Sequence, residues 1–267
     1  MTDLLLRAGE WEQVTPWSAR WRHLFFRVEA GSFSDGNDDT ETVLVPLSGG
    51  CRVEGDGGSW ELGGREDVFA GLPWALYLPR DTAYDVKAEG EVAVCSARCE
   101  RRREPVLISP ADIEVEVRGA GNATRQINHI VKPEFPAERI LVVEVFTPAG
   151  NWSSYPPHKH DEDRPPSEVV LEETYYFRTR APEAFAVQRL YSPRHGLDVT
   201  ETVRHGDLML VPYGYHTTAA AHGYDLYYLN ALAGERRSMA AADDPELAWI
   251  RGAWADVEPD PRVPLVR

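Results

Sequence analysis

Three histidines and two glutamates in the second half of the chain have the types and order of a divalent metal site. His158 and His160 are one residue apart, and alternate residues of a β-strand point to the same face, so both imidazoles can face inward. Glu172 and Glu173 follow at the start of an aromatic segment, and His216 comes after a Pro/Gly turn. Only one of the adjacent glutamates can share the face of the histidines. Three imidazoles and one carboxylate, with open positions for water or substrate, suit Zn, Mn, Fe, Ni or Co.

Each part of this pattern also has an ordinary structural explanation. A lone His-x-His pair is usually a surface feature, adjacent glutamates are usually solvated, and Pro-x-Gly-x-His alone is a turn. Their joint order within one short all-β segment is what predicts a metal site. The other histidines have no such context, and we interpret them as structural or surface residues: His23, His129, His195, His205 and His222.

Short apolar segments separated by Gly, Pro and Asp predict the elements that position this site. They are rich in Val, Leu, Tyr and Phe, and several alternate in polarity with the period of two that is typical of β-strands. The pattern favours an all-β sandwich or barrel over alternating strands and helices. We expect strands at 42–47, 75–78, 91–95, 113–117, 140–146, 174–178, 185–191, 208–211 and 226–232.

One short helix is predicted near the C-terminus. Asp244 can cap it, Pro245 suits its first position, and Glu246 favours the positive end of a helix. The segment through Trp249 to Gly252 would then lay an apolar stripe against a barrel.

The two halves of the chain look like imperfect copies of each other. Residues 75–79 and 208–212 are both aliphatic strands that end in proline. We therefore predict one barrel in residues 1–115 and a second in 116–267. The first half has His23 alone and no His-x-His pair, so a duplicated first barrel would have lost the metal chemistry.

Charge and composition argue against several classes of partner. The chain has 267 residues, a net charge of −15 and 43% hydrophobic residues. Nucleic acids and anionic membranes need a basic surface, and the apolar runs are shorter than the roughly 20 residues of a membrane span. The first residues lack the pattern of a signal peptide, so we expect a cytoplasmic protein. The odd number of cysteines predicts ordinary thiols at Cys51, Cys95 and Cys99.

The order of the histidines and glutamates resembles that of the cupin superfamily, which consists of small metal-binding β-barrels. The spacing departs from the usual cupin pattern, because Asp161–Val170 separates the histidine pair from the glutamates and the turn is Pro-x-Gly-x-His. A narrower family is more similar, the 5-deoxy-glucuronate isomerases of myo-inositol catabolism, which are related to the 5-keto-4-deoxyuronate isomerases of pectin breakdown. The resemblance is strongest over 125–250 and rests on the motifs at 150–161, 171–177, 211–216 and 223–230.

This resemblance implies a bicupin, two jelly-roll-like barrels in one chain, with metal only in the C-terminal barrel. The implied ligands are His158, His160, Glu173 and His216. Glu173 is preferred to Glu172 because the ligand glutamate of the pectin-pathway relatives precedes a similar aromatic strand. The implied cofactor is a divalent metal ion, with zinc as first choice and manganese, iron or nickel as alternatives. We also expect that the chain forms a homo-oligomer and that it binds a small sugar acid.

The implied reaction is an aldose–ketose isomerisation that converts 5-deoxy-D-glucuronate to 5-dehydro-2-deoxy-D-gluconate. One proton leaves the carbon next to the aldehyde and returns to the aldehyde carbon, while a metal polarises the two neighbouring oxygens. Glu173 is a candidate for both ligand and base, and Tyr175 on the same face is a candidate proton relay. A hydride shift is an open alternative.

The substrate carboxylate and hydroxyls need polar partners. Arg189 is the first choice for the carboxylate, with Arg125 or Lys159 second, because arginine can pair with a carboxylate through two hydrogen bonds. Tyr228 and Asn230 share one face of their strand and are candidates for binding sugar hydroxyls, with core packing as the alternative.

Two other functions also fit a cupin with three histidines and one glutamate. One is a dioxygenase that uses iron, nickel or copper and consumes oxygen. The other is a non-catalytic sugar-binding cupin, which would bind a sugar without turnover.

Overall fold

The computed structural model describes residues 4–267, which form four β-sheets. In the first half of the chain, a six-stranded sheet has the order β11 (Val106–Ile108), β8 (Ala75–Leu78), β5 (Thr40–Pro46), β10 (Glu91–Arg98), β3 (Leu24–Ala30) and β2 (Gln13–Val14). A four-stranded sheet has the order β4 (Phe33–Asn37), β9 (Thr82–Ala88), β6 (Gly49–Gly55) and β7 (Gly58–Arg65).

The second half of the chain supplies the other two sheets. The seven-stranded sheet has the order β1 (Leu5–Leu6), β19 (Leu208–Val211), β16 (Glu172–Thr179), β21 (Leu226–Ala233), β14 (Ile140–Thr147), β13 (Arg125–Val131) and β12 (Glu114–Arg118). The five-stranded sheet has the order β18 (Leu197–Val203), β17 (Ala186–Ser192), β20 (Tyr215–Ala220), β15 (Trp152–Lys159) and β22 (Ala242–Asp243). Short helical turns occur at α1 (Pro16–Ala19), η1 (Pro110–Asp112), η2 (Pro193–His195) and η3 (Ala248–Trp254).

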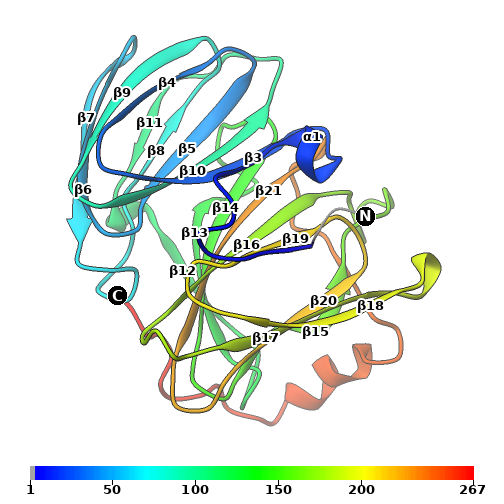
Figure 1. The fold of residues 1–267 in the computed structure, drawn as a ribbon. Coiled ribbons are helices and arrows are strands. Elements are labelled where there is room, and N and C mark those ends of the chain that lie inside the picture. The colour runs from blue at the N-terminus through cyan, green and yellow to red at the C-terminus, as the bar shows by residue number, and fades with distance from the viewer. Residues whose placement is uncertain (1–3) are drawn as a thin grey trace.

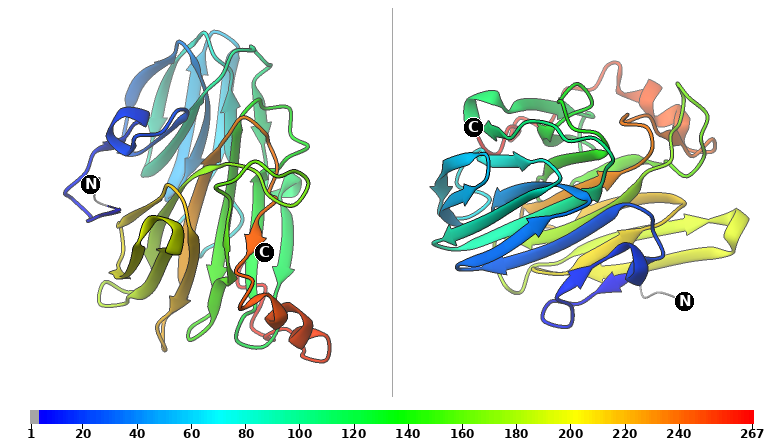
Figure 2. Two further views of the ribbon diagram at one scale, coloured as in Figure 1. Left: turned by 90° about the vertical axis from the view of Figure 1, so that its right-hand side faces the viewer. Right: turned by 90° about the horizontal axis from the view of Figure 1, so that it is seen from above.

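The four sheets are stacked (Figures 1 and 2). Apolar side chains pack between each neighbouring pair. The first core fills the space between the four- and six-stranded sheets and includes Leu44, Val53, Leu76 and Val92. The second joins the six- and seven-stranded sheets and includes Val43, Cys95, Val142 and Tyr227. The third fills the barrel between the seven- and five-stranded sheets and includes Val143, Tyr175, Leu190 and Tyr228. Neighbouring residues such as Tyr227 and Tyr228 thus face different cores, as strand alternation requires.

The all-β prediction is confirmed, and each of the nine predicted strands is present in the structure. The boundaries at 75–78 and 208–211 agree with β8 and β19. The division into barrels at 1–115 and 116–267 stays a prediction. One strand of the first segment, β1, lies in the sheet of the second because it pairs with β19, and β12 spans the predicted boundary because it begins at Glu114.

The C-terminal helix differs from its prediction. Asp244 does cap the turn, since its Oδ1 accepts a hydrogen bond from the Glu246 amide at 3.0 Å. The helical residues form the 3₁₀ element η3, however, and Trp249 is 68% exposed. The predicted apolar stripe against the barrel is therefore wrong, because three residues per turn do not give the continuous face that an α-helix would.

The three cysteines are free and buried, as predicted, and burial raises the pKa of the thiols of Cys51 and Cys99 to about 12. Among residues 4–267, no helix is long and apolar enough to cross a membrane.

Two glutamates, the buried Glu41 and the half-buried Glu172, connect the barrels in a reciprocal way. Glu41 on β5 accepts hydrogen bonds from the backbone amides of residues 138, 139 and 140, where β14 begins, at 2.8, 2.6 and 2.8 Å. Glu172 on β16 accepts them from the amides of residues 22, 23 and 24, where β3 begins. Each barrel therefore supplies one carboxylate that satisfies the unpaired amides at a strand start of the other.

Replacing Glu41 with alanine is expected to lower the free energy of unfolding by about 3 kcal/mol or more, because three amides would lose a buried acceptor at about 1–3 kcal/mol each. Denaturation in urea measures the loss, with the exposed Glu66→Ala as the control. Equal midpoints for the two variants would contradict the bridging role of Glu41.

Candidate metal centre

Two histidines and one glutamate converge inside the barrel between the seven- and five-stranded sheets. His160 directly follows β15, Glu173 lies on β16 and His216 on β20. The Nε2 atom of His160 is 2.8 Å from Oε2 of Glu173, and Nε2 of His216 is 3.3 Å from the same oxygen. All three residues are buried, and their candidate ligand atoms lie within 4.8 Å of one another.

His158 lies at the edge of this cluster. It is paired with His216 across β15 and β20, and the two ring centroids are 4.6 Å apart. It does not belong to the closest group of three, and its side chain is half-buried. The structure thus brings the predicted fourth ligand next to the other three, with its ring against that of His216.

Backbone carbonyl groups fix the orientation of all three imidazoles. The Nδ1 atoms of His158, His160 and His216 lie 3.3, 2.9 and 3.2 Å from the carbonyl oxygens of Pro156, Leu171 and Gly214, respectively. With Nδ1 donating to a carbonyl, each Nε2 carries a lone pair, which is the tautomer that metal-binding histidines adopt. Nε2 of His216 is buried and has no hydrogen-bond partner among the described residues. The donor set therefore fits a metal ion.

The electrostatics of the cluster keep Glu173 ionised and disfavour the charged form of His158. Burial alone would raise the pKa of Glu173, but the adjacent His160 and His216 outweigh it and lower the pKa to about 2. Burial, followed by the nearby His216 and His160, lowers the pKa of His158 well below its usual value. An ionised carboxylate and a neutral imidazole are the forms that bind metals.

The side chains of the two adjacent glutamates point to opposite faces of β16. Glu172 points away from the cluster and accepts hydrogen bonds from the backbone amides of His23 and Leu24 at 3.0 and 2.8 Å. Glu173 is the carboxylate that faces the histidines.

Tyr175, Tyr228 and Asn230 all face the interior of the same barrel. The rings of Tyr175 and Tyr228 are 4.9 Å apart, and the ring of Tyr175 is 5.7 Å from that of His216. Asn230 is buried, and its Nδ2 donates to the carbonyl oxygen of Thr174 at 3.0 Å, which leaves its own oxygen available as an acceptor.

Arg125 is a buried cation in this barrel. Its side chain donates to the carbonyl oxygens of Ala123 and Tyr155, both at 3.2 Å, and it is only 3% exposed. It forms no ion pair with a carboxylate of residues 4–267, and burial lowers its pKa to about 10. An uncompensated buried charge is costly, which makes Arg125 a candidate anion-binding group in this barrel.

The structure does not bring the other two predicted cations to the cluster. Arg189 is next to Leu190, which pairs with His216 and faces the core, so Arg189 faces outward. It forms two hydrogen bonds with the exposed Asp198 at 3.0 and 2.8 Å. The preference for Arg189 is corrected accordingly, because strand alternation places its side chain outside the barrel.

Lys159 is corrected for the same reason. It lies between His158 and His160 and therefore points to the opposite face. Its ammonium group binds the carboxylates of Asp161 and Glu168 and has no access to the histidine cluster.

Sequence reasoning missed two serines in this barrel, Ser153 and Ser154. Their hydroxyls contact those of Tyr228 and Tyr175, respectively. Two adjacent serines on a strand should face opposite sides, so no signal in the sequence indicated that both face the core.

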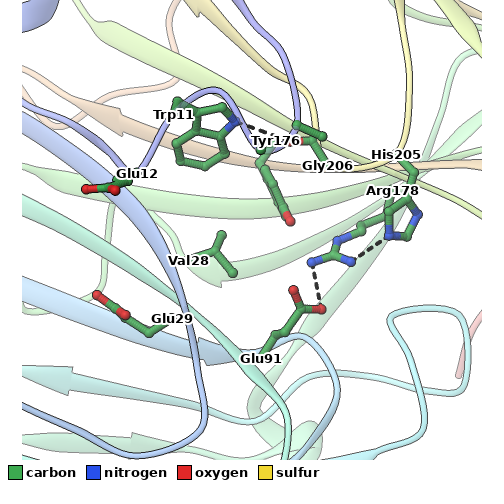
Figure 3. A pocket seen from close by; sticks show the side chains of 11 residues that line it. Trp11, Glu12, Val28, Glu29, Glu91, Tyr176, Arg178, His205 and Gly206 are labelled. Carbon is green, nitrogen blue, oxygen red and sulfur yellow. Dashed lines mark hydrogen bonds and ion pairs between the residues drawn. The ribbon is translucent and has the colours of Figure 1, made fainter.

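A separate cavity of about 570 Å³ lies on the other side of β16 (Figure 3). Tyr176 and Arg178 line it, and Arg178 binds Glu91 at 2.9 Å and His205 at 2.6 Å. Because Tyr175 and Tyr176 face opposite sides of the sheet, this cavity is not connected with the histidine cluster through β16.

Two stacked antiparallel barrels, with imidazoles and a carboxylate inside one of them, define the chain as a double-barrelled cupin. The pattern of the KduI/IolB family matches residues 5–250. The chain belongs to the KduI/IolB family.

Relatives with known names support this assignment. The 5-deoxy-glucuronate isomerase of Geobacillus kaustophilus is 42% identical over 250 residues, covering 91% of each chain. The enzyme of the same name from Listeria monocytogenes is 38% identical over 83% of this chain and 84% of its own.

Solved structures agree with the fold. An IolB-like protein from Salmonella typhimurium LT2 superposes with a TM-score of 0.89 and 36% identity, covering 93% of this chain and 99% of that one. Oxalate decarboxylase of Bacillus subtilis, whose Mn(II) centres have been characterised, has a TM-score of 0.63 over 91% of this chain and 80% of its own. At 12% identity, it supports the fold alone.

Proposed function

We propose that this chain is a sugar-acid isomerase that converts 5-deoxy-D-glucuronate to 5-dehydro-2-deoxy-D-gluconate. The observation that carries the proposal is its 42% identity to a 5-deoxy-glucuronate isomerase over 91% of both chains. The buried histidines, Glu173 and Arg125 in one barrel support it, because the reaction needs a group that polarises two oxygens and a cation for the substrate carboxylate.

The proposed metal ligands are His158, His160, Glu173 and His216. Zinc is the first choice, with manganese, iron or nickel as alternatives. A bound divalent ion would supply Lewis acidity, which polarises the aldehyde oxygen and the adjacent hydroxyl of the open-chain sugar. The carbonyl partners of the imidazoles support this ligand set because, with each Nδ1 donating to a carbonyl, each Nε2 is left with a lone pair for a metal ion.

The proposed substrate contacts follow from the polar groups inside the barrel. Arg125 binds the substrate carboxylate through guanidinium hydrogens that no carboxylate of residues 4–267 occupies. Tyr228 and the free oxygen of Asn230 bind sugar hydroxyls.

Glu173 and Tyr175 are the proposed groups for proton transfer. The ionised carboxylate of Glu173 accepts the proton from the carbon next to the aldehyde and returns it to the aldehyde carbon. A second proton moves from the hydroxyl oxygen to the former aldehyde oxygen, and Tyr175 relays it. Burial raises the pKa of Tyr175 well above its usual value, so its hydroxyl stays protonated and can donate.

Turnover of 5-deoxy-glucuronate, followed by NMR in D₂O with and without a chelator, tests the function. We expect deuterium in the product at the former aldehyde carbon, loss of turnover on chelation, and recovery when zinc or manganese is added. Product without solvent deuterium would indicate either a hydride shift or a return of the same proton by Glu173 before it exchanges with solvent. A fully metallated protein that gives no product would overturn the isomerase proposal, and oxygen uptake on addition of substrate would favour a dioxygenase.

The cellular setting is also a proposal. We place the chain in myo-inositol catabolism, as a cytoplasmic homo-oligomer that acts on a small sugar acid. The relatives' names support the sugar acid, and the net charge of −15 argues against nucleic-acid and membrane partners. Light scattering of the purified protein measures the oligomeric state.

A further inference from the structure

Two neighbouring serines on β15 both direct their hydroxyls into the barrel. The hydroxyl of Tyr228 lies 3.0 Å from Oγ of Ser153 and 3.4 Å from Oγ of Ser154. Neighbouring residues of a regular strand point to opposite faces, so β15 is irregular here. Ser154 has a φ of +49°, and the pairing of β15 with β20 changes register between Ser153 and His158. This bulge is what turns the second hydroxyl inward.

The conformation of Ser154 is costly for a residue with a side chain. The left-handed region costs a non-glycine residue about 1–2 kcal/mol, and Ser154 is buried, so no solvent contact offsets that cost. A strained residue persists where its surroundings hold it in place, and such residues gather at functional sites. The partner that holds Ser154 is the hydroxyl of Tyr175, at 2.9 Å from its Oγ.

The serine pair lies between the proposed carboxylate site and the histidine cluster. The carbonyl oxygen of Tyr155, next to Ser154, accepts a hydrogen bond from Arg125 at 3.2 Å. The ring of Tyr175 is 5.7 Å from that of His216. The hydroxyls of Ser153, Tyr228, Ser154 and Tyr175 therefore form one chain along the space that a bound sugar acid would span.

We propose that Ser154 is a positioning residue of the isomerase, whose hydroxyl holds Tyr175 and Tyr228 in the orientation that meets the substrate hydroxyls. This inference rests on the proposed function. Tyr228 donates to Ser153, and in the contact between Ser154 and Tyr175 either hydroxyl can donate, so Ser154 is able to donate to Tyr175. When it does, the proton of Tyr175 is free to point at a substrate oxygen. Ser154 acts through the tyrosines and needs no contact with the substrate itself.

Two substitutions of Ser154 separate its hydroxyl from its backbone conformation. Ser154→Gly and Ser154→Ala both remove the hydroxyl, but only glycine adopts a positive φ without strain. The matched control is Ser96→Ala, because Ser96 is an equally buried serine in the other barrel, bound to Thr42 at 2.7 Å. For all four proteins, zinc content, thermal stability, kcat and KM for 5-deoxy-glucuronate are measured.

We expect both Ser154 variants to keep their zinc and to lose about 10–100-fold in kcat, the size of effect that a misplaced catalytic group produces. KM should change much less than kcat, and Ser96→Ala should match the wild type. A purely structural role would instead separate the two variants, with glycine at least as active as serine. Wild-type kcat in Ser154→Gly would overturn the inference.

A wild-type enzyme without turnover would overturn the proposed function rather than this inference. Crystal structures of the wild type and Ser154→Gly then decide the positioning role without substrate. We expect the hydroxyl of Tyr175 or Tyr228 to move by about 1 Å, a displacement that matters for catalysis. Unchanged positions of both hydroxyls would contradict the positioning role of Ser154.

Discussion

Glu173→Gln is expected to lose both the bound metal and the turnover of 5-deoxy-glucuronate, whereas Glu172→Gln is expected to keep both. Glu173 is the anionic group of the cluster, with Oε2 at 2.8 Å from His160 and 3.3 Å from His216. A neutral amide is a weaker ligand and cannot accept a proton from carbon. Loss of acid–base catalysis alone corresponds to about 10²–10⁴-fold in kcat. Metal analysis by mass spectrometry and steady-state kinetics measure the two losses.

Glu172→Gln is a closely matched control, because the two glutamates are adjacent and point to opposite faces of β16. The carboxylate of Glu172 accepts hydrogen bonds from backbone amides of the first barrel. An amide in its place brings N–H groups against N–H groups, so the free energy of unfolding should fall by about 1–3 kcal/mol. Metal content should stay at that of the wild type. A Glu172→Gln protein that folds but lacks metal, or a metallated and active Glu173→Gln, would contradict the assignment.

Much of the site prediction rested on strand alternation, and the limits of that rule explain which site residues were predicted wrongly. The period of two correctly indicated that His158 and His160 face the same side and that one glutamate alone could join them. The same rule places Lys159 outside, so that error was avoidable from the sequence. Strand alternation alone could not choose between Glu172 and Glu173, because both faces of β16 are buried, one against each core, and the preference for Glu173 came from the family resemblance.

Other features depend on pairings that no local pattern contains. Arg189 faces outward because Leu190 is paired with His216, a register set across two strands that are distant in sequence. The inward turn of Ser154 depends on a bulge, and nothing in Ser-Ser marks one. The polar segment at Asp244 did indicate a cap, but the apolar pattern after it could not show that Trp249 would face solvent.

Arg125→Met is expected to lower kcat/KM about 10²–10³-fold while making the protein more stable. The substrate carboxylate would lose its buried cationic partner, and removing one member of a buried charge pair costs about 2–5 kcal/mol in binding. In the protein without substrate, Arg125 is 3% exposed, and its guanidinium donates to backbone carbonyls and has no carboxylate partner among residues 4–267. Replacing such a charge with an apolar side chain of similar length should therefore raise the free energy of unfolding, by about 1–2 kcal/mol.

Arg189→Met provides the control for the expected rise in stability and fall in kcat/KM. Arg189 is 43% exposed in its pair with Asp198, and an exposed ion pair contributes about 0–1 kcal/mol, so neither quantity should change much. Kinetics on 5-deoxy-glucuronate and urea denaturation of both variants measure the two effects. Wild-type kcat/KM in Arg125→Met would exclude Arg125 as the carboxylate site. A fall in both stability and activity would show instead that Arg125 stabilises the barrel. A buried charge that is retained only to bind substrate should lower the stability of the enzyme without substrate.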